Sequence, residues 1–147
     1  DLFGKFDHFN TNDSHVIPAL IYRFVDALNN KQDKVYCWGT GEASRGFLYA
    51  EDLCDAIIQS LKSPLETDLP INIGTPEEIK IKDLAHIIAK LPGFQGEIVF
   101  TGEVGDGQPR RCIDVSRAKE MLNWEAKTSL EDGLKKTIEW YKNSVIL

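Results

Sequence analysis

The sequence predicts an α/β fold in a single unit, with short strands and about four to five helices. Apolar residues recur at helical spacing in several segments, and short apolar runs bounded by glycine or proline separate these segments. Neither an internal repeat, a low-complexity tract nor a linker-like change of composition divides the chain. We therefore expect one domain over residues 1–147, a length typical of a single domain.

The first third of the chain is predicted to hold one helix followed by two short strands. Four apolar residues recur at helical spacing between residues 16 and 28, namely Ile17, Leu20, Phe24 and Leu28. Asp13 or Ser14 is available as the N-cap of this helix. Residues 34–38 predict a strand that ends at a glycine, and residues 47–49 predict a second extended piece.

The middle third predicts a helix, a strand and another helix. Asp52 places a carboxylate at the positive end of a helix over residues 52–62, where it favours capping over catalysis. Residues 70–73 form a short apolar run closed by a glycine, which predicts a strand. Residues 82–91 carry apolar residues on one helical face, and Pro92-Gly93 ends that helix.

The last third continues the alternation. We expect, in order, a strand over 97–100, a glycine-rich loop over 101–109, an extended segment over 111–115 and a short helix over 116–122. Thr128 and Glu131 form a T-x-x-E capping signature ahead of a final amphipathic helix.

Composition excludes several functional classes. Lysine and arginine number 17 against 23 acidic residues, a net charge of −6 that argues against a nucleic-acid-coating surface. No apolar run approaches a membrane span, so no membrane partner is expected. The three cysteines lack the spacing of a disulfide framework or a metal site, which favours a reducing, cytoplasmic location. The chain begins with Asp1 rather than methionine, which fits a piece of something longer.

His15 and Arg23 are the first candidate functional pair. They are eight residues apart on the first predicted helix, about 80° apart around its axis and hence on roughly the same side. The helix start favours a neutral imidazole, so His15 suits proton transfer near neutral pH. A capping histidine and a solvated arginine remain the commoner interpretation of such a pair.

Two loop segments supply further cations. Trp38-Gly39-Thr40-Gly41 followed by Arg45 combines an aromatic ring, a flexible turn and a guanidinium, which suits a phosphate. Arg110 and Arg111 follow Asp106-Gly107-Gln108-Pro109. Taken alone, the first segment is more often an ordinary turn with its tryptophan in the core, and the second is more often surface.

The sequence does not predict a complete dinucleotide-binding domain. Ser44 stands where a third glycine would have to follow Gly39-Thr40-Gly41, and none of the tyrosines has a lysine four residues on. We therefore expect no cofactor to bind this segment alone and assign no hydride chemistry to it.

Several motifs together resemble one family. The series comprises Leu2-Phe3-Gly4, Asp7, Ser14-His15-Val16-Ile17-Pro18-Ala19-Leu20, Arg23-Phe24, Trp38-Gly39-Thr40-Gly41, Arg45, Ile71-Asn72-Ile73-Gly74 and Asp106-Gly107-Gln108-Pro109-Arg110-Arg111. In this order it resembles the carboxy-terminal half of the GDP-L-fucose synthase family, which are extended short-chain dehydrogenases/reductases that act as 3,5-epimerases and 4-reductases. The match covers essentially the whole chain, although Lys5 stands where the family has proline.

The resemblance implies specific roles. His15 is implied as the acid/base partner in epimerisation. The implied GDP-sugar site is lined by Val16, Arg23, Trp38, Gly39, Arg45 and Arg111. NADP would be the cofactor of the full-length enzyme, held by an amino-terminal Rossmann half that is absent from residues 1–147, together with the catalytic cysteine and the reduction site.

Two alternatives remain beside this hypothesis. The chain is a stand-alone binding module without catalysis, or it is the substrate domain of an epimerase or dehydratase for another nucleotide sugar. In the favoured interpretation, a surface that packs on the Rossmann half becomes exposed. We therefore expect self-association or docking to a Rossmann half.

Overall fold

The computed structural model describes residues 1–10, 12–102 and 107–144, and it confirms the α/β class. The helices of this part are α1 (Val16–Asn29), α2 (Ala50–Lys62), α3 (Ile81–Lys90), α4 (Ser116–Leu122) and α5 (Leu130–Ser144). The strands are β1 (Leu2–Phe3), β2 (Lys34–Cys37), β3 (Ser44–Arg45), β4 (Leu48–Tyr49), β5 (Ile79–Lys80), β6 (Glu97–Phe100) and β7 (Arg110–Arg111).

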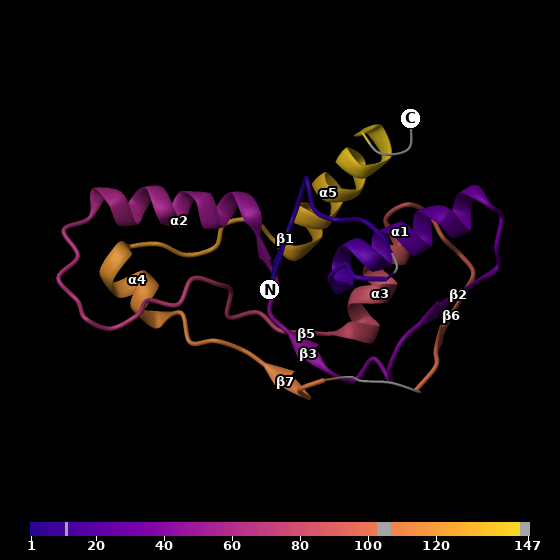
Figure 1. Ribbon diagram of the computed structural model, residues 1–147, viewed down its shortest axis with the longest axis horizontal. Helices are drawn as coiled ribbons and strands as arrows, with labels where there is room; N and C mark the ends of the chain where they lie inside the picture. Colours follow the sequence, from indigo (N-terminus) through magenta and orange to yellow (C-terminus); the bar gives the residue numbers. More distant parts are fainter. Residues whose placement is uncertain (11, 103–106, 145–147) are drawn as a thin grey trace.

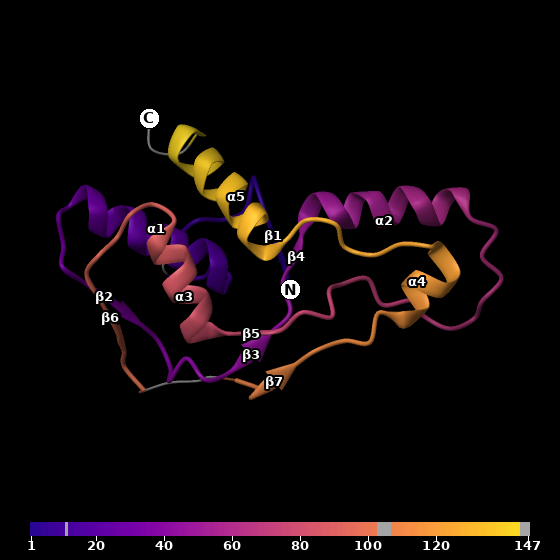
Figure 2. The same cartoon turned by 180° about the vertical axis from the view of Figure 1, so that it is seen from behind.

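The strands form three small sheets rather than one. β1 pairs with β4 and β2 pairs with β6, both in parallel, while β3 lies between antiparallel β5 and parallel β7. The molecule is elongated, with α1, α3, β2 and β6 at one end and α2 and α4 at the other (Figure 1). The three-stranded sheet lies between these ends, as the reverse view also shows (Figure 2).

Two separate hydrophobic clusters form the core of the molecule. The larger cluster joins α1, α3 and α5 through fully buried residues that include Phe24, Leu84 and Leu134. The smaller cluster joins α2 to α4 and contains Leu48, Ala56, Ala118, Leu122 and Trp124. Such burial of apolar side chains is the main stabilising contribution to the fold.

Most predicted elements are confirmed, but several details are wrong. The helix expected at 116–122 has these bounds, and α1 begins just after His15. Residues 70–73 form no strand. Of the segment expected to be extended over 111–115, only Arg111 belongs to a strand, namely β7 (Arg110–Arg111). The two-residue strands β1, β3 and β5 were not predicted, because two residues carry no detectable period.

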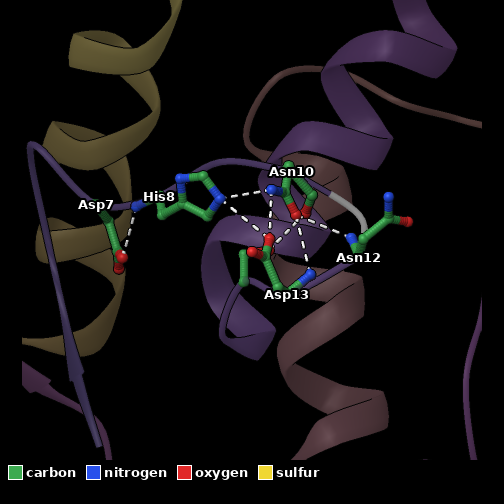
Figure 3. Close-up of polar contacts among 6 residues, drawn as sticks. Asp7, His8, Asn10, Asn12 and Asp13 are labelled. Atoms are coloured by element: carbon green, nitrogen blue, oxygen red, sulfur yellow. Dashed lines mark hydrogen bonds and ion pairs between the residues drawn. The ribbon is translucent and has the colours of Figure 1, made fainter.

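The prediction that Asp13 or Ser14 caps α1 is wrong. His15 is the N-cap residue and its side chain makes no capping hydrogen bond. Asp13 instead lies 3.0 Å from His8 Nε2 and accepts a hydrogen bond from the amide of Asn10, whereas Ser14 donates to the Asn10 carbonyl (Figure 3). The hydrogen bond from Asn10 is the main cause that lowers the pKa of Asp13. These side chains fold the segment before α1 onto itself.

Asp52 lies in the first turn of α2, as predicted, but it does not cap that helix. Its side chain is buried, and its carboxylate accepts hydrogen bonds from the backbone N–H groups of Lys127 and Thr128 and from the Thr128 hydroxyl. Thr128 is therefore not the cap of α5. Ser129 has that role, because its hydroxyl accepts a hydrogen bond from the backbone N–H of Asp132. Asp52 thus fastens α2 to the chain that leads into α5.

Replacing Asp52 by alanine should destabilise the fold by about 2 kcal/mol, because the partly buried N–H and hydroxyl donors of Lys127 and Thr128 lose a charged acceptor. Chemical denaturation with Asp55→Ala as the control measures the effect. Asp55 is exposed on the same helix, so its replacement should change the free energy of unfolding by less than about 0.5 kcal/mol. Equal stability of the two variants would contradict the role of Asp52.

Candidate functional site

A cavity of about 400 Å³ lies between α1, the start of the β2–β3 connection and the three-stranded sheet. It brings together residues far apart in the sequence, and His15, Val16, Arg23, Trp38, Arg45 and Arg111 all line it. Gly39, the remaining predicted residue, is buried beside Trp38 and is not among the described residues that line the cavity. The cavity is therefore cationic and has an aromatic wall.

Arg23 and Trp38 form one side of the cavity. Arg23 Nη1 donates a hydrogen bond of 2.5 Å to the carbonyl of Tyr36, and its guanidinium carbon lies 4.8 Å from the centroid of the Trp38 ring. The Trp38 side chain is 64% exposed, so it is not in the core, contrary to the commoner interpretation of such a turn. The cation–π contact orients both groups before any ligand is present.

Arg45 and Arg111 form another side of the cavity, and pairing of β3 with β7 places them together. The register aligns Arg45 with Arg111 and Ser44 with Arg110. Side chains alternate between the faces of a strand, so Arg110 points away from the cavity. There it binds both carboxylate oxygens of Glu78, at 3.0 and 2.6 Å, and this contact is the largest cause that lowers the pKa of Glu78.

Local contacts hold both cavity arginines. Arg45 Nη1 donates to the carbonyl of Ser44 at 2.7 Å. Arg111 Nε donates to the side-chain oxygen of Gln108 at 3.3 Å, and its Nη1 lies 3.9 Å from a carboxylate oxygen of Asp1. Asp106, which belongs to the same predicted loop motif, lies outside the described residues. A guanidinium carries its N–H donors in a fork that matches a bidentate anion such as a phosphate.

His15 lies where two cavities meet. It lines the cationic cavity and also a second cavity of about 380 Å³ that is formed by residues 1–7. Its side chain is exposed at the start of α1, and Arg23 lies farther along the same helix. The two side chains of this helix therefore line one cavity, and their roles towards a ligand stay predictions.

The loop between β2 and β3 is held in place by α3. Gly39 and Gly41 have φ values of 74° and 76°, a conformation that favours glycine. The carbonyl of Gly41 accepts a hydrogen bond from Lys82 N, and the Glu42 carboxylate binds Lys80 and Lys82. These lysines lower the pKa of Glu42 to about 2. Sequence reasoning missed this ion cluster because its members are some 40 residues apart.

Comparisons with known proteins give this site a context. The model of the NAD dependent epimerase/dehydratase family matches residues 1–74, which is half of the chain. The chain belongs to this family.

Two curated GDP-L-fucose synthases, one from a plant and one from a bacterium, are similar to this chain. A probable GDP-L-fucose synthase 1 of Oryza sativa is 40% identical, with 99% of this chain and 44% of that protein covered. The GDP-L-fucose synthase of Sinorhizobium fredii is 43% identical, with 99% and 46% covered. The chain thus spans about half the length of the curated relatives it matches.

A solved structure supports the same relationship at the level of the fold. The GDP-L-fucose synthetase of Naegleria fowleri, bound to NADP, superposes with a TM-score of 0.89 and 26% identity. This superposition covers 97% of this chain and 44% of that protein. The short strands and helices described above therefore have the arrangement found in part of that synthetase.

The Gly39-Thr40-Gly41 segment of this epimerase-family chain does not fit the phosphate groups of a dinucleotide. In a dinucleotide-binding turn the glycines connect a strand to a helix, whose N-terminus then faces the pyrophosphate. Here the segment connects β2 to β3, and Ser44 belongs to β3.

Within the described ranges, no group of three or more His, Cys, Asp or Glu side chains is arranged to hold a metal ion, and no helix is long and apolar enough to span a membrane.

Cys37 also lines the cationic cavity, which the sequence did not indicate. Its side chain is buried on β2, and burial raises the pKa of its thiol to about 11, although nearby Arg23 acts in the opposite direction. The thiol is therefore protonated at neutral pH and a poor nucleophile. Because unfolding restores the ordinary pKa of 9.0, this group favours the folded state below pH 9, and its contribution is lost as the pH rises towards 11.

Proposed function

We propose that this chain is the nucleotide-sugar-binding part of a GDP-L-fucose synthase-like enzyme, with GDP-4-keto-6-deoxy-D-mannose as its substrate. One observation carries the proposal: three guanidinium groups, a tryptophan and a histidine from four separate segments line one cavity. The similarity to GDP-L-fucose synthases from a plant and a bacterium supports GDP as the nucleotide.

The cations suit a diphosphate. Arg45 and Arg111 lie side by side on neighbouring strands, so their forked donors can bind oxygens of the two phosphate groups. Arg23 lies over the Trp38 ring at the other side of the cavity. A flat base could stack on the ring face there, or a further phosphate oxygen could bind the guanidinium. The only carboxylate that lines this cavity in the described residues belongs to Asp1, so the site remains cationic overall.

His15 provides the proton transfer. A hydrogen on the carbon next to a ketone is acidic, because its removal leaves an enolate whose charge rests on the ketone oxygen. The imidazole can take such a proton while a second acid on the opposite face of the carbon delivers one, or it can deliver a proton after a second base has removed one there, and inversion at that carbon results. We propose that this second group belongs to the part of the enzyme beyond residues 1–147. Its place between the two cavities leaves room for the sugar on one side and the diphosphate on the other.

The reduction step is proposed to need a part of the enzyme beyond residues 1–147. The Naegleria fowleri relative binds NADP and is more than twice as long as the segment matched here. Gly39-Thr40-Gly41 connects two strands and so offers no cradle for the cofactor's phosphates. We propose that NADP is the cofactor of the full-length enzyme, and we assign only substrate binding and proton transfer to this chain.

Calorimetric titration of GDP tests the proposed site. Arg111→Ala should weaken GDP binding by roughly 10-fold to 30-fold, because one bidentate phosphate contact is lost. Arg110→Ala is the matched control, since Arg110 is the adjacent residue on the opposite face and binds Glu78. Its affinity should stay within about twofold of the unmodified chain.

Titration of UDP completes the test. Tighter binding of GDP than of UDP supports the GDP-sugar assignment, whereas preference for UDP would favour the epimerase or dehydratase of another nucleotide sugar. A folded chain that binds neither nucleotide, or that responds equally to the two arginine variants, contradicts the proposed site.

A further inference from the structure

Phe6 is an exposed aromatic residue in a strained backbone conformation. Its φ is 65°, in the left-handed region that turns usually fill with glycine or asparagine, and a bulky residue there is a rare outlier. The residue is 83% exposed, so burial of the ring does not offset the strain. Strained residues of this kind gather at active sites and ligand clamps, which directs attention to what Phe6 faces.

Phe6 lines the second cavity, which is formed by residues 1–7 and which His15 also lines. The chain after β1 passes beside α5 (Figure 1), and the Phe6 ring centroid lies 4.9 Å from that of Trp140, with an interplanar angle of 58°. Trp140 is half-buried on α5 and supports the ring from one side. The cavity therefore has an aromatic wall that is held in place before any ligand is present.

The second cavity has an apolar character near Phe6. Two of its charged side chains are engaged elsewhere, because Lys5 Nζ binds a carboxylate of α2 at 3.2 Å and the Asp7 carboxylate accepts a hydrogen bond from the backbone N–H of His8. Leu2 and Phe6 are the exposed large apolar residues among those that line this cavity. An apolar group suits such surroundings better than a hydroxyl, which would lose its hydrogen bonds to water.

We propose that Phe6 is a specificity-determining residue that contacts the C6 methyl group of a 6-deoxy sugar. This role rests on the proposed function, in which His15 transfers a proton at a carbon next to the C4 ketone. One such carbon is C5, and it carries the C6 methyl group, so the methyl group lies one bond from a reacting atom. The methyl group is also the one apolar substituent of the proposed sugar, and Phe6 lines the same cavity as His15. Phe6 thus favours a methyl group over a hydroxymethyl group at this position.

Two sugar nucleotides that differ only at C6 test this role. GDP-6-deoxy-D-mannose has a methyl group there, whereas GDP-D-mannose has a hydroxyl on the same carbon. Calorimetric titration of the unmodified chain should show about 5-fold to 20-fold tighter binding of the 6-deoxy compound, less than the roughly 10²-fold that a fully apolar pocket achieves. Phe6→Asn should abolish this preference but leave the affinity for GDP within about twofold, because the arginines bind the diphosphate.

Three controls separate the contact with the sugar from a structural role of Phe6. Asparagine tolerates the left-handed conformation better than phenylalanine, so Phe6→Asn should keep or raise the melting temperature. Phe6→Leu retains an apolar side chain and should retain most of the preference. Tyr36→Asn should retain all of it, because Tyr36 is 57% exposed but is not among the residues that line either cavity.

The outcomes distinguish this role from the proposed function. Equal affinity of the unmodified chain for the two sugars, or an unchanged preference in Phe6→Asn, would overturn the role of Phe6, while GDP binding that depends on Arg111 would still support the proposed function. Equal losses of preference in Phe6→Asn and Tyr36→Asn would also overturn it. A folded chain that binds no GDP would overturn both.

Discussion

Replacing His15 by asparagine should slow exchange of the hydrogens next to the substrate ketone by about 10²-fold to 10⁴-fold, the usual contribution of a general acid or base. The assay uses GDP-4-keto-6-deoxy-D-mannose in deuterated water, with this chain assembled with the uncovered part of the Sinorhizobium fredii relative. Mass spectrometry measures deuterium uptake. Asparagine keeps a polar side chain at the junction of the two cavities but cannot transfer a proton.

Binding measurements separate the chemical role of His15 from a structural one. GDP affinity of His15→Asn should stay within about twofold of the unmodified chain, because the diphosphate is assigned to the arginines. Arg111→Ala should show the reverse pattern, with weaker binding and exchange that recovers at saturating substrate. Exchange at an unchanged rate in His15→Asn, or no exchange by the unmodified assembly, would contradict the role proposed for His15.

Gly41→Ala should lower the free energy of unfolding by about 3 kcal/mol. A Cβ atom at this position would lie 2.8 Å from the Phe100 ring and 2.9 Å from the Lys82 Cβ atom, in a backbone conformation with φ of 76°. The left-handed conformation costs roughly 1–2 kcal/mol for alanine, and overpacking adds roughly 1–3 kcal/mol. Thermal denaturation measures the loss.

Gly102→Ala separates the two causes. Gly102 has a φ of 70°, close to that of Gly41, but a Cβ atom there would meet nothing within 4 Å. This control should lose only about 1 kcal/mol, the part due to backbone conformation. If the two variants melted at the same temperature, the close packing of the β2–β3 loop on α3 would not contribute to stability.

Helical periodicity predicted α1, α3 and α5 well, because each of these helices buries an apolar face. Ile17, Leu20 and Phe24 recur at helical spacing and all are buried in α1. The two-residue strands escaped prediction because hydrogen bonds to distant partners define them. Pairing of Ser44 with both Lys80 and Arg110, for example, depends on tertiary structure alone.

Residue types and spacing singled out most residues of the candidate site, but only the family resemblance favoured a site over the commoner capping or surface interpretation. Arg23, Arg45 and Arg111 look individually like surface arginines, and only their convergence on one cavity distinguishes them. Cys37 could not be found, since a single buried cysteine on a strand resembles ordinary core. Asp52 was interpreted as a cap of its own helix because the sequence gives no sign of its contact with Thr128, 76 residues away.

Arg110 binds Glu78 whereas Arg111 lines the cavity, and this difference depends on the length of the connection between β6 and β7. Adjacent residues of a strand face opposite sides, so moving β7 by one position would place either Arg110 or Cys112 in the cavity and either Pro109 or Arg111 opposite Glu78. Homologues that gain or lose one residue between β6 and β7 would then present a different side chain to the ligand, unless the connection absorbs the change. Length variants of this connection should therefore alter ligand affinity even when both arginines are kept.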